Sequence, residues 1–229
     1  MMVGNNIEEL PASIPGDAYQ DKHSSPTFKA HLVIVVRDKD GKVINIHKQR
    51  SHSPTANFVQ VLLPLSYYTI TGNTVTVTNI SGSSNAWSFT LGSYSYPNTA
   101  TNNPSYLVMI QVGSGQQSNP YSSHNLAAPI ANGNGPGQLS YSPPSILQNI
   151  IVSGDSASFV ISQTFTNVSG ATITITEVGV VVNVQNNGPG CAYTQNFGPV
   201  LMWYDTLSSP ISIPNGGGIT IYYTFIVNP

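Results

Sequence analysis

Residues that could carry acid–base chemistry are scarce over most of this chain. After position 50 the only carboxylates are those of Asp155, Glu177 and Asp205. Hydrolytic catalysis usually needs two carboxylates, or a nucleophile with a base and an orienting acid, converging in one pocket. Three widely separated acids offer few such pairs. The sequence therefore predicts a protein that is not an enzyme, with no catalytic residues.

Each of these acids has a structural interpretation beside a functional one. Glu177 lies among apolar neighbours, so it is either a buried general acid or a carboxylate satisfied by turn N–H groups or facing solvent. Asp155 belongs to Ser-Gly-Asp-Ser, which is typical of a turn. Asp205 follows Trp203 and Tyr204 and either lines a sugar-binding surface or ends a strand. We expect the structural role at all three positions.

Metal, thiol and phosphate chemistry find little support. His31 and His47 could face each other across a hairpin, but no third ligand accompanies them. Cys191 is the only cysteine, so we expect a small buried side chain rather than a disulfide or a nucleophile. The glycine clusters do not lie between a strand and a helix, as a phosphate-binding loop would. We expect no metal site and no cofactor.

Four residues are candidates for contact with sugars. Asn79-Ile-Ser81 and Asn167-Val-Ser169 match the acceptor pattern for glycosylation, which makes Asn79 and Asn167 candidate attachment sites. Trp87 and Trp203 are candidates for stacking on a glycan, because aromatic rings pack against sugar faces.

The elements that must position these residues are almost all strands. β-Branched runs at 31–37 and 42–47 flank an Asp-Gly turn, which predicts a hairpin. Ser53-Pro54 predicts the start of one short helix near residues 54–63. The other predicted strands are 68–71, 74–78, 87–91, 106–112, 158–166, 172–182 and 219–227, with residues 167–170 as a hairpin turn. Without a βαβ rhythm, this pattern indicates an all-β, two-sheet β-sandwich, with a jelly roll as the expected form.

Charge divides the chain into two parts. Only 7% of the residues are charged, against roughly 25% in an ordinary domain. All seven Lys and Arg and six of the nine acids lie in the first 50 residues. We predict an extended N-terminal arm at 1–27 and a β-sandwich domain at 28–229, with a long loop region at 113–145. Charge specifies partners, so we expect subunit contacts in the arm and hairpin, through Glu8, Glu9, Lys22, Arg37, Lys48 and Arg50.

The same composition argues against several partners. A neutral body lacks the clustered Lys and Arg that bind nucleic acid, and we interpret the basic stretch 42–52 as a solvated strand end. No apolar run approaches 18 residues, so we expect no membrane span. The first residues lack the basic and apolar regions of a signal peptide.

Several segments resemble a loosely related group of virion structural proteins from tailed phages and archaeal viruses. The segments are 35–43, 53–63, 110–115, 126–130, 137–141, 165–170 with 176–179, and 219–227. The neutral composition is similar to that of capsid and turret proteins of viruses that infect hot-acid archaea, such as Sulfolobus turreted icosahedral virus. The resemblance implies a homo-oligomeric capsid, turret or tail component on the virion exterior, bound to other virion proteins. It also implies a structural role for Glu177.

Two alternatives stay open beside a virion subunit. One is an extracellular subunit of a cell-surface filament or surface layer, and the other is a carbohydrate-binding module that recognises a host-surface glycan. Acid unfolds proteins mainly by protonating carboxylates that are paired in the native state, and the body has only three. Heat would predict more ion pairs rather than fewer. The composition therefore predicts an acid-stable protein.

Overall fold

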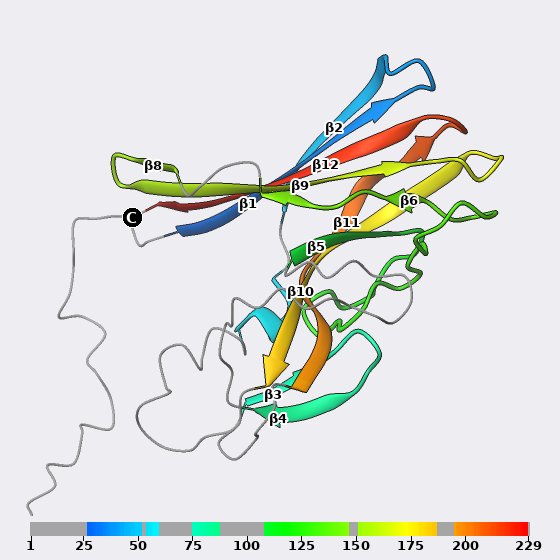
Figure 1. Ribbon diagram of the computed structural model, residues 1–229. Helices are drawn as coiled ribbons and strands as arrows, with labels where there is room; N and C mark the ends of the chain where they lie inside the picture. Colours follow the sequence, from blue (N-terminus) through cyan, green and yellow to red (C-terminus); the bar gives the residue numbers. More distant parts are fainter. Residues whose placement is uncertain are drawn as a thin grey trace, which may run out of the picture.

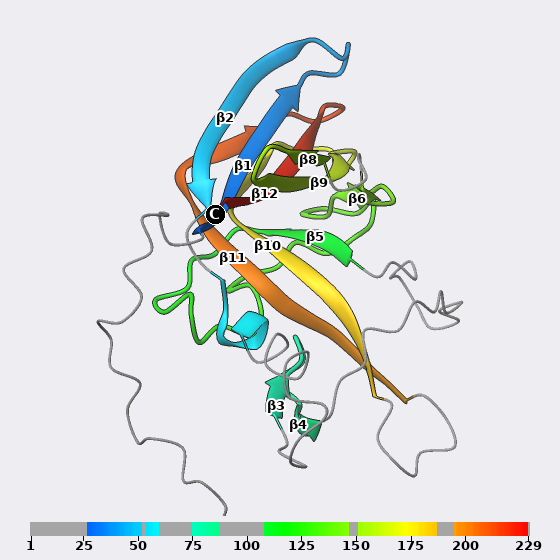
Figure 2. The ribbon, with the colours of Figure 1, turned by 90° about the vertical axis from the view of Figure 1, so that its left-hand side faces the viewer.

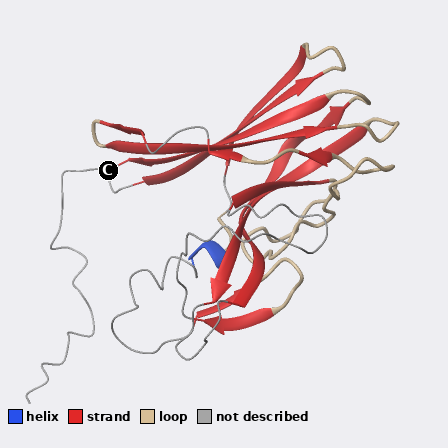
Figure 3. Ribbon diagram, viewed as in Figure 1, coloured by secondary structure: helices blue, strands red, loops and turns tan. Residues whose placement is uncertain are grey.

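The computed structural model describes residues 27–51, 54–59, 75–87, 108–146, 151–186 and 195–228. Strands make up most of these ranges, and α-helix occurs among them only at residues 56–59 (Figure 3). The all-β prediction is confirmed. The helix predicted near 54–63 is present as this single turn, and residues 60–63 lie outside the described residues, as does the predicted strand 68–71.

The larger sheet has seven antiparallel strands. Its main order is β2-β1-β12-β9-β6, and the short strands β7 and β8 also pair with β9. Its strands are β1 (Thr27–Arg37), β2 (Val43–Ser51), β6 (Ser140–Tyr141), β7 (Ser145–Ile146), β8 (Ile151–Ser153), β9 (Ser156–Thr166) and β12 (Gly218–Asn228). Figure 2 shows β2 as the outermost strand of this sheet.

The smaller sheet has the order β11-β10-β5, and a separate hairpin pairs β3 with β4. These strands are β3 (Val75–Thr78), β4 (Ser84–Trp87), β5 (Val108–Gly113), β10 (Ile173–Asn186) and β11 (Gln195–Ile213). In Figure 1 the larger sheet lies above β5 and β10. The two antiparallel sheets pack face to face, as the predicted β-sandwich requires.

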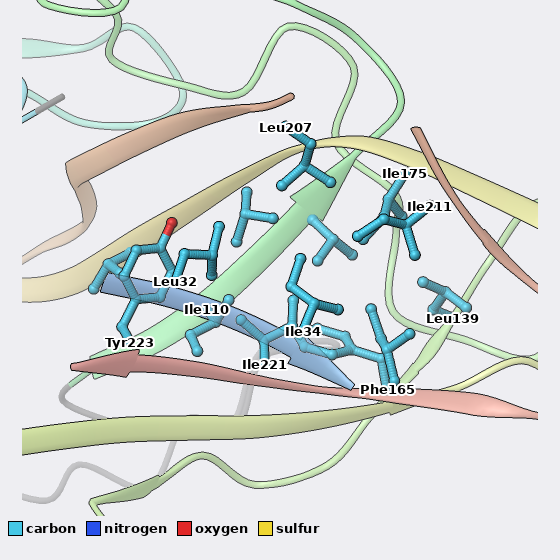
Figure 4. Close-up of a cluster of buried hydrophobic side chains, with 14 of the residues drawn as sticks. Leu32, Ile34, Ile110, Leu139, Phe165, Ile175, Leu207, Ile211, Ile221 and Tyr223 are labelled. Atoms are coloured by element: carbon cyan, nitrogen blue, oxygen red, sulfur yellow. The ribbon is translucent and has the colours of Figure 1, made fainter. Parts of the chain in front are cut away.

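The core between the sheets follows from the two-residue period of the strands. Leu32 and Ile34 of β1 lie beside Ile221 and Tyr223 of β12, and all four face Ile110 of β5 (Figure 4). Each of these side chains is fully buried. Burying one large apolar side chain stabilises a fold by about 1.5–3 kcal/mol relative to leaving it exposed. Alternation on the long strands therefore supplies one face of the sandwich with a continuous apolar layer.

The β1–β2 hairpin forms as its turn residues predict. The Oδ1 atom of Asp38 accepts hydrogen bonds from the backbone N–H groups of Asp40 and Lys42, both at 3.0 Å. Gly41 has a φ of 80°, a left-handed conformation that glycine adopts without steric cost. The turn thus fixes the register of the hairpin that carries most of the basic residues.

The connection after β9 differs from the expected hairpin. β9 pairs with β12 in one sheet and β10 pairs with β11 in the other, so residues 167–172 cross between the sheets. The β11–β12 connection makes the same crossing alongside it. Asn167 joins the two corners, because its backbone N–H donates to the Gly217 carbonyl and its carbonyl accepts from the Gly216 N–H. A two-stranded ribbon therefore bends from one sheet into the other.

β11 also departs from the sequence analysis, which did not predict this 19-residue strand. Asp205, expected to end a strand, lies in its middle. Pro210 falls in the irregular stretch between the pairs Glu177–Thr206 and Ile175–Ile211. Proline is tolerated at such bulges because its missing N–H breaks no ladder hydrogen bond.

The long connection between β5 and β6 is folded onto the smaller sheet. Leu126, Ile130 and Leu139 are buried, and Leu126 packs with Tyr204 and Leu201 on the face of that sheet turned away from the main core. A backbone bridge joins Gly113 to Pro129. The part of this connection around Leu126 therefore covers the second face of the smaller sheet, whereas Ile130 and Leu139 belong to the main core.

Within the described ranges, the structure contains no helix with the length and hydropathy needed to cross a lipid bilayer.

Candidate functional site

Glu177 on β10 is fully buried and accepts four hydrogen bonds. Its Oε1 accepts from the backbone N–H groups of Ala128 at 2.7 Å and Gly115 at 3.2 Å. Its Oε2 accepts from the Ala127 N–H and from the Tyr204 hydroxyl, both at 2.9 Å. A carboxylate has about four lone-pair positions, and here four donors occupy them. The interpretation of Glu177 as a carboxylate satisfied by loop N–H groups is confirmed.

Two glycines leave the space that the Glu177 carboxylate fills. A Cβ at Gly113 would lie 2.3 Å from the Glu177 Oε1, and a Cβ at Gly115 would lie 2.6 Å from the Ala127 Cβ. Both distances are too short for any other residue without movement. Thr176 adds a hydroxyl hydrogen bond to the Gly115 carbonyl. Segments 110–115, 126–130 and 176–179, three of those that carry the resemblance, thus meet at one carboxylate.

Tyr204 completes the environment of this carboxylate. Its hydroxyl donates to Glu177 and accepts the N–H of Gln117 at 2.8 Å. Burial, partly offset by hydrogen bonds to Thr206 and Gln117, raises the pKa of Tyr204. The hydroxyl therefore remains a donor, and the group holds the loop to the smaller sheet. We call Glu177, Tyr204 and residues 113–128 the Glu177 anchor.

Asp205 forms a second buried polar network, between the sheets. It accepts hydrogen bonds from the Tyr223 hydroxyl at 2.8 Å and from the Ser51 hydroxyl, and the Trp203 indole N–H donates to Ser51. Burial, followed by the charge of Asp205, raises the pKa of Tyr223 well above its usual value. The network joins β2, β11 and β12 through neutral donors and one carboxylate. It ties the sheets together and leaves Asp205 away from any sugar-binding surface.

Trp203, a candidate for glycan stacking, lies in an aromatic cluster. It is only 3% exposed, and its ring packs edge-on against Phe28, Phe58 and Phe225 with centroids 5.3–5.5 Å apart. No ring face is open to a sugar, so the structure corrects this candidate to a core residue. Trp87 pairs with Val75 through the backbone, and its side chain lies outside the described residues.

The two glycosylation candidates occupy different environments. The Asn79 Oδ1 accepts from the Ser81 N–H and hydroxyl and from the Ser83 N–H, in a partly exposed turn. Asn167 is fully buried, and its Nδ2 donates to the carbonyls of Ala171 and Ile213, both at 2.8 Å. A glycan would attach at that nitrogen. The folded chain therefore excludes Asn167 as an acceptor and uses it to hold the sheet-crossing corners.

The histidines of the hairpin do not face each other. His31 pairs with Arg50 and His47 with Ile34, which places the two rings on opposite faces of the sheet. The His47 ring forms a hydrogen bond with the Gln49 Oε1 at 2.8 Å. In the part of the chain that the structure describes, no group of three or more His, Cys, Asp or Glu side chains could hold a metal ion.

Of the predicted contact residues, Glu8, Glu9 and Lys22 lie outside the described residues. Arg37 is half-buried at the end of β1, whereas Lys48 and Arg50 are exposed on β2. Lys48 lies opposite Val33, and Arg50 lies opposite His31, on the outer face of the larger sheet. The structure therefore brings Lys48 and Arg50 together and leaves Arg37 at the far end of the hairpin.

Several apolar residues on β2 are exposed, which the sequence did not predict. Val43, Ile44 and Ile46 are 43%, 50% and 53% exposed. Ile46 shares the outer face with Lys48 and Arg50, because side chains on one face recur every second residue. Ile44 lies at a shift in the register, and beyond it Val43 pairs with Arg37. In the sequence these apolar residues alternate with polar ones. That pattern is the same for a strand whose apolar face is buried, so it did not predict their exposure. We call Lys29, His31, Val43, Ile44, Ile46, Lys48 and Arg50, with the edge of β2, the β2 surface.

The β2 surface also includes an edge of the larger sheet, as far as the described strands form it. Among the described residues β2 pairs with β1 alone, so every second backbone N–H and C=O points away from a strand partner. The described ion pair of the hairpin joins Lys39 to Asp40 at its exposed turn. Within the described ranges no carboxylate pairs with Lys48 or Arg50.

The chain was compared with protein-family models, with curated proteins and with solved structures, and none of the three comparisons found a match.

Proposed function

We propose that this protein is a structural subunit of a virus particle, which acts by assembling with copies of itself and with other virion proteins. The observation that carries the proposal is the β2 surface. It combines a strand edge that pairs with no second described strand with three exposed apolar side chains, Val43, Ile44 and Ile46. Natural proteins usually protect such an edge, so an open one favours pairing with another chain.

The internal structure of the domain supports a structural role. Glu177 and Asp205, two of the three acids after position 50, hold segments of the sandwich together from buried positions. Each carboxylate accepts hydrogen bonds from donors on other segments of the chain and so holds those segments in place. The chain thus uses its few acidic groups to define shape.

The virus particle is proposed from the resemblance of the seven segments to virion proteins. Three of those segments, 110–115, 126–130 and 176–179, meet at the Glu177 anchor. On this proposal the sandwich is of the jelly-roll form and the protein is a capsid, turret or tail component on the virion exterior. The same open edge favours one other function, a cell-surface filament linked by donor strands.

Sedimentation velocity over a wide concentration range, with electron microscopy of the same samples, tests assembly. We expect a discrete homo-oligomer whose population falls in the Ile44→Thr/Ile46→Thr variant. Val168→Thr is a matched control, because Val168 is 47% exposed at the β9–β10 corner. Immunodetection of the chain in purified particles tests the virion. A protein that stays monomeric at every concentration and is missing from particles would contradict the proposal, and its presence in cell-surface filaments would replace it.

A further inference from the structure

We infer that the partner of the β2 surface is the acidic N-terminal arm, residues 1–26, of a second copy of this chain, which adds a strand to the open edge of β2. This inference rests on the proposed assembly and identifies the contact that would produce it.

The arm and the β1–β2 hairpin carry opposite net charges. Residues 1–26 contain Glu8, Glu9, Asp17 and Asp21 against one basic residue, Lys22, for a net charge of −3. Residues 27–51 contain six Lys and Arg against two acids at the hairpin turn, for a net charge of +4. Opposite charges on two surfaces steer their association and fix its register. Residues 1–26 and residues 27–51 are therefore complementary in charge.

The described acids of the chain are buried, distant from β2 or engaged in their own turn. Glu177 and Asp205 are buried. Asp155 lies at the turn between β8 and β9, and β12 and β1 separate β9 from β2 in the sheet. Asp38 binds the backbone of its own turn, and Asp40 pairs with Lys39. The arm holds the remaining acids of the sequence.

Pairing of β2 with β2 of another copy would instead bring two strands of like charge together. β2 carries Lys48 and Arg50 and contains no acid, and Lys42 directly precedes it. Antiparallel pairing of two such strands would bring cations close to cations across the interface, which is destabilising. The cations at this edge therefore disfavour pairing with β2 of another copy and favour pairing with an acidic segment.

The residue pattern of the arm also matches the outer face of β2. In an extended segment Ile7 and Glu9 share one face, and Glu8 and Leu10 share the other. The outer face of β2 presents Ile46 and Lys48 at the same two-residue spacing. A strand formed by residues 7–10 can therefore place an apolar side chain beside Ile46 and a carboxylate beside Lys48.

A second copy supplies the arm, because an arm passed from copy to copy satisfies the open edge of each and joins copies into a ring or filament. Ile46 lies opposite Val35, eight strand residues from Thr27, which corresponds to about 27 Å. Residues 7–26 are long enough to cover that distance within one chain as well, so the cysteine experiment compares pairing between chains with pairing inside one chain.

Cysteine pairing between two differently tagged chains tests this contact. In a Cys191→Ser background, one chain carries Glu9→Cys and the other Lys48→Cys. After mixing and mild oxidation, we expect a mixed disulfide dimer on a non-reducing gel. Glu9→Cys mixed with Asp155→Cys is the matched control, because Asp155 is exposed but distant from β2, and it should give little mixed product.

Charge reversal provides an independent measurement on the unlinked protein. Glu8→Lys/Glu9→Lys and Lys48→Glu/Arg50→Glu should each weaken self-association by about tenfold. Combining the two sets in one chain should restore most of the association, because the complementary charges are then exchanged. Loss without restoration would contradict the pairing.

The outcomes separate this inference from the proposed function. Association that persists while no mixed disulfide forms overturns the inference and leaves assembly standing. A third variant carries Glu9→Cys and Lys48→Cys in the same Cys191→Ser chain. If only this variant forms a disulfide, and forms it within single chains, each copy binds its own arm, which also overturns the inference. A chain that never associates removes both proposals.

Discussion

The Glu177 anchor and the β2 surface use charge in opposite ways. At the anchor one carboxylate is buried, and four donors from β11 and from the loop after β5 converge on it. On the β2 surface Lys48 and Arg50 are exposed, and no described carboxylate pairs with them. A charge enclosed by donors fixes the fold, because separating it from them leaves buried groups unsatisfied. A charge in water contributes little to folding and remains available to a partner.

Replacing Glu177 should produce the largest effect on folding. Glu177→Ala leaves three backbone N–H groups and one hydroxyl without an acceptor, so we expect the free energy of unfolding to fall by about 4 kcal/mol or more. Urea denaturation of the variant measures this. Asp155→Ala, which removes an exposed acid, should change stability by less than about 0.5 kcal/mol. Equal losses in the two variants would contradict the anchor.

Alkaline pH should produce the second-largest loss of stability, by weakening the hydrogen bonds of the two buried tyrosines. The pKa values of Tyr204 and Tyr223 are raised in the folded protein, so both hydroxyls keep their protons where the same groups in the unfolded chain lose theirs. Their contribution is present below the ordinary tyrosine pKa of about 10 and is lost as the pH rises above it. We expect the free energy of unfolding to fall by about 1.4 kcal/mol per pH unit for each tyrosine.

Denaturation at pH 8 to 11 measures this slope. Tyr223→Phe should reduce it, whereas Tyr121→Phe, at a tyrosine that is 57% exposed, should leave it unchanged. An identical slope in the Tyr223→Phe variant would show that this hydroxyl does not set the alkaline limit.

Removing the exposed cations should have the smallest effect on folding. Lys48→Ala/Arg50→Ala is expected to change the free energy of unfolding by less than about 0.5 kcal/mol, because neither cation has a described charge partner. The same variant should weaken self-association in sedimentation experiments. A loss of stability similar to that of Glu177→Ala would mean that the two regions do not differ as described.

Much of the fold was predictable because it depends on local pattern. The Asp38–Gly41 turn and its flanking β-branched runs specify a hairpin in any context. The runs that became β9, β10 and β12 were placed correctly, but β9 and β10 were paired wrongly. A turn such as 167–170 can either close a hairpin or cross between sheets, and the choice depends on where the apolar faces meet. β11 was missed because its prolines and bulges obscure the alternation.

The candidate site was less predictable. Trp203 and Asn167 matched surface motifs, yet both are buried, because a motif carries no information about what packs over it. Ile44 and Ile46 are residues of a type that is usually buried, yet they are exposed, because β2 is an edge strand among the described strands. Acid stability and the virion location stay predictions.

The sequence by itself determined the class of fold, the scarcity of charge and the separation of an acidic arm from a basic hairpin, because these depend only on residue type and order. The tertiary structure decided what each charged group does. A carboxylate that loop N–H groups enclose stabilises the fold, whereas a carboxylate in water remains free to bind a partner. Packing between segments distant in sequence decides which of these two roles a carboxylate has. Glu177 became an anchor because residues 113–128 fold over it, and Lys48 stayed available because no described strand pairs beyond β2.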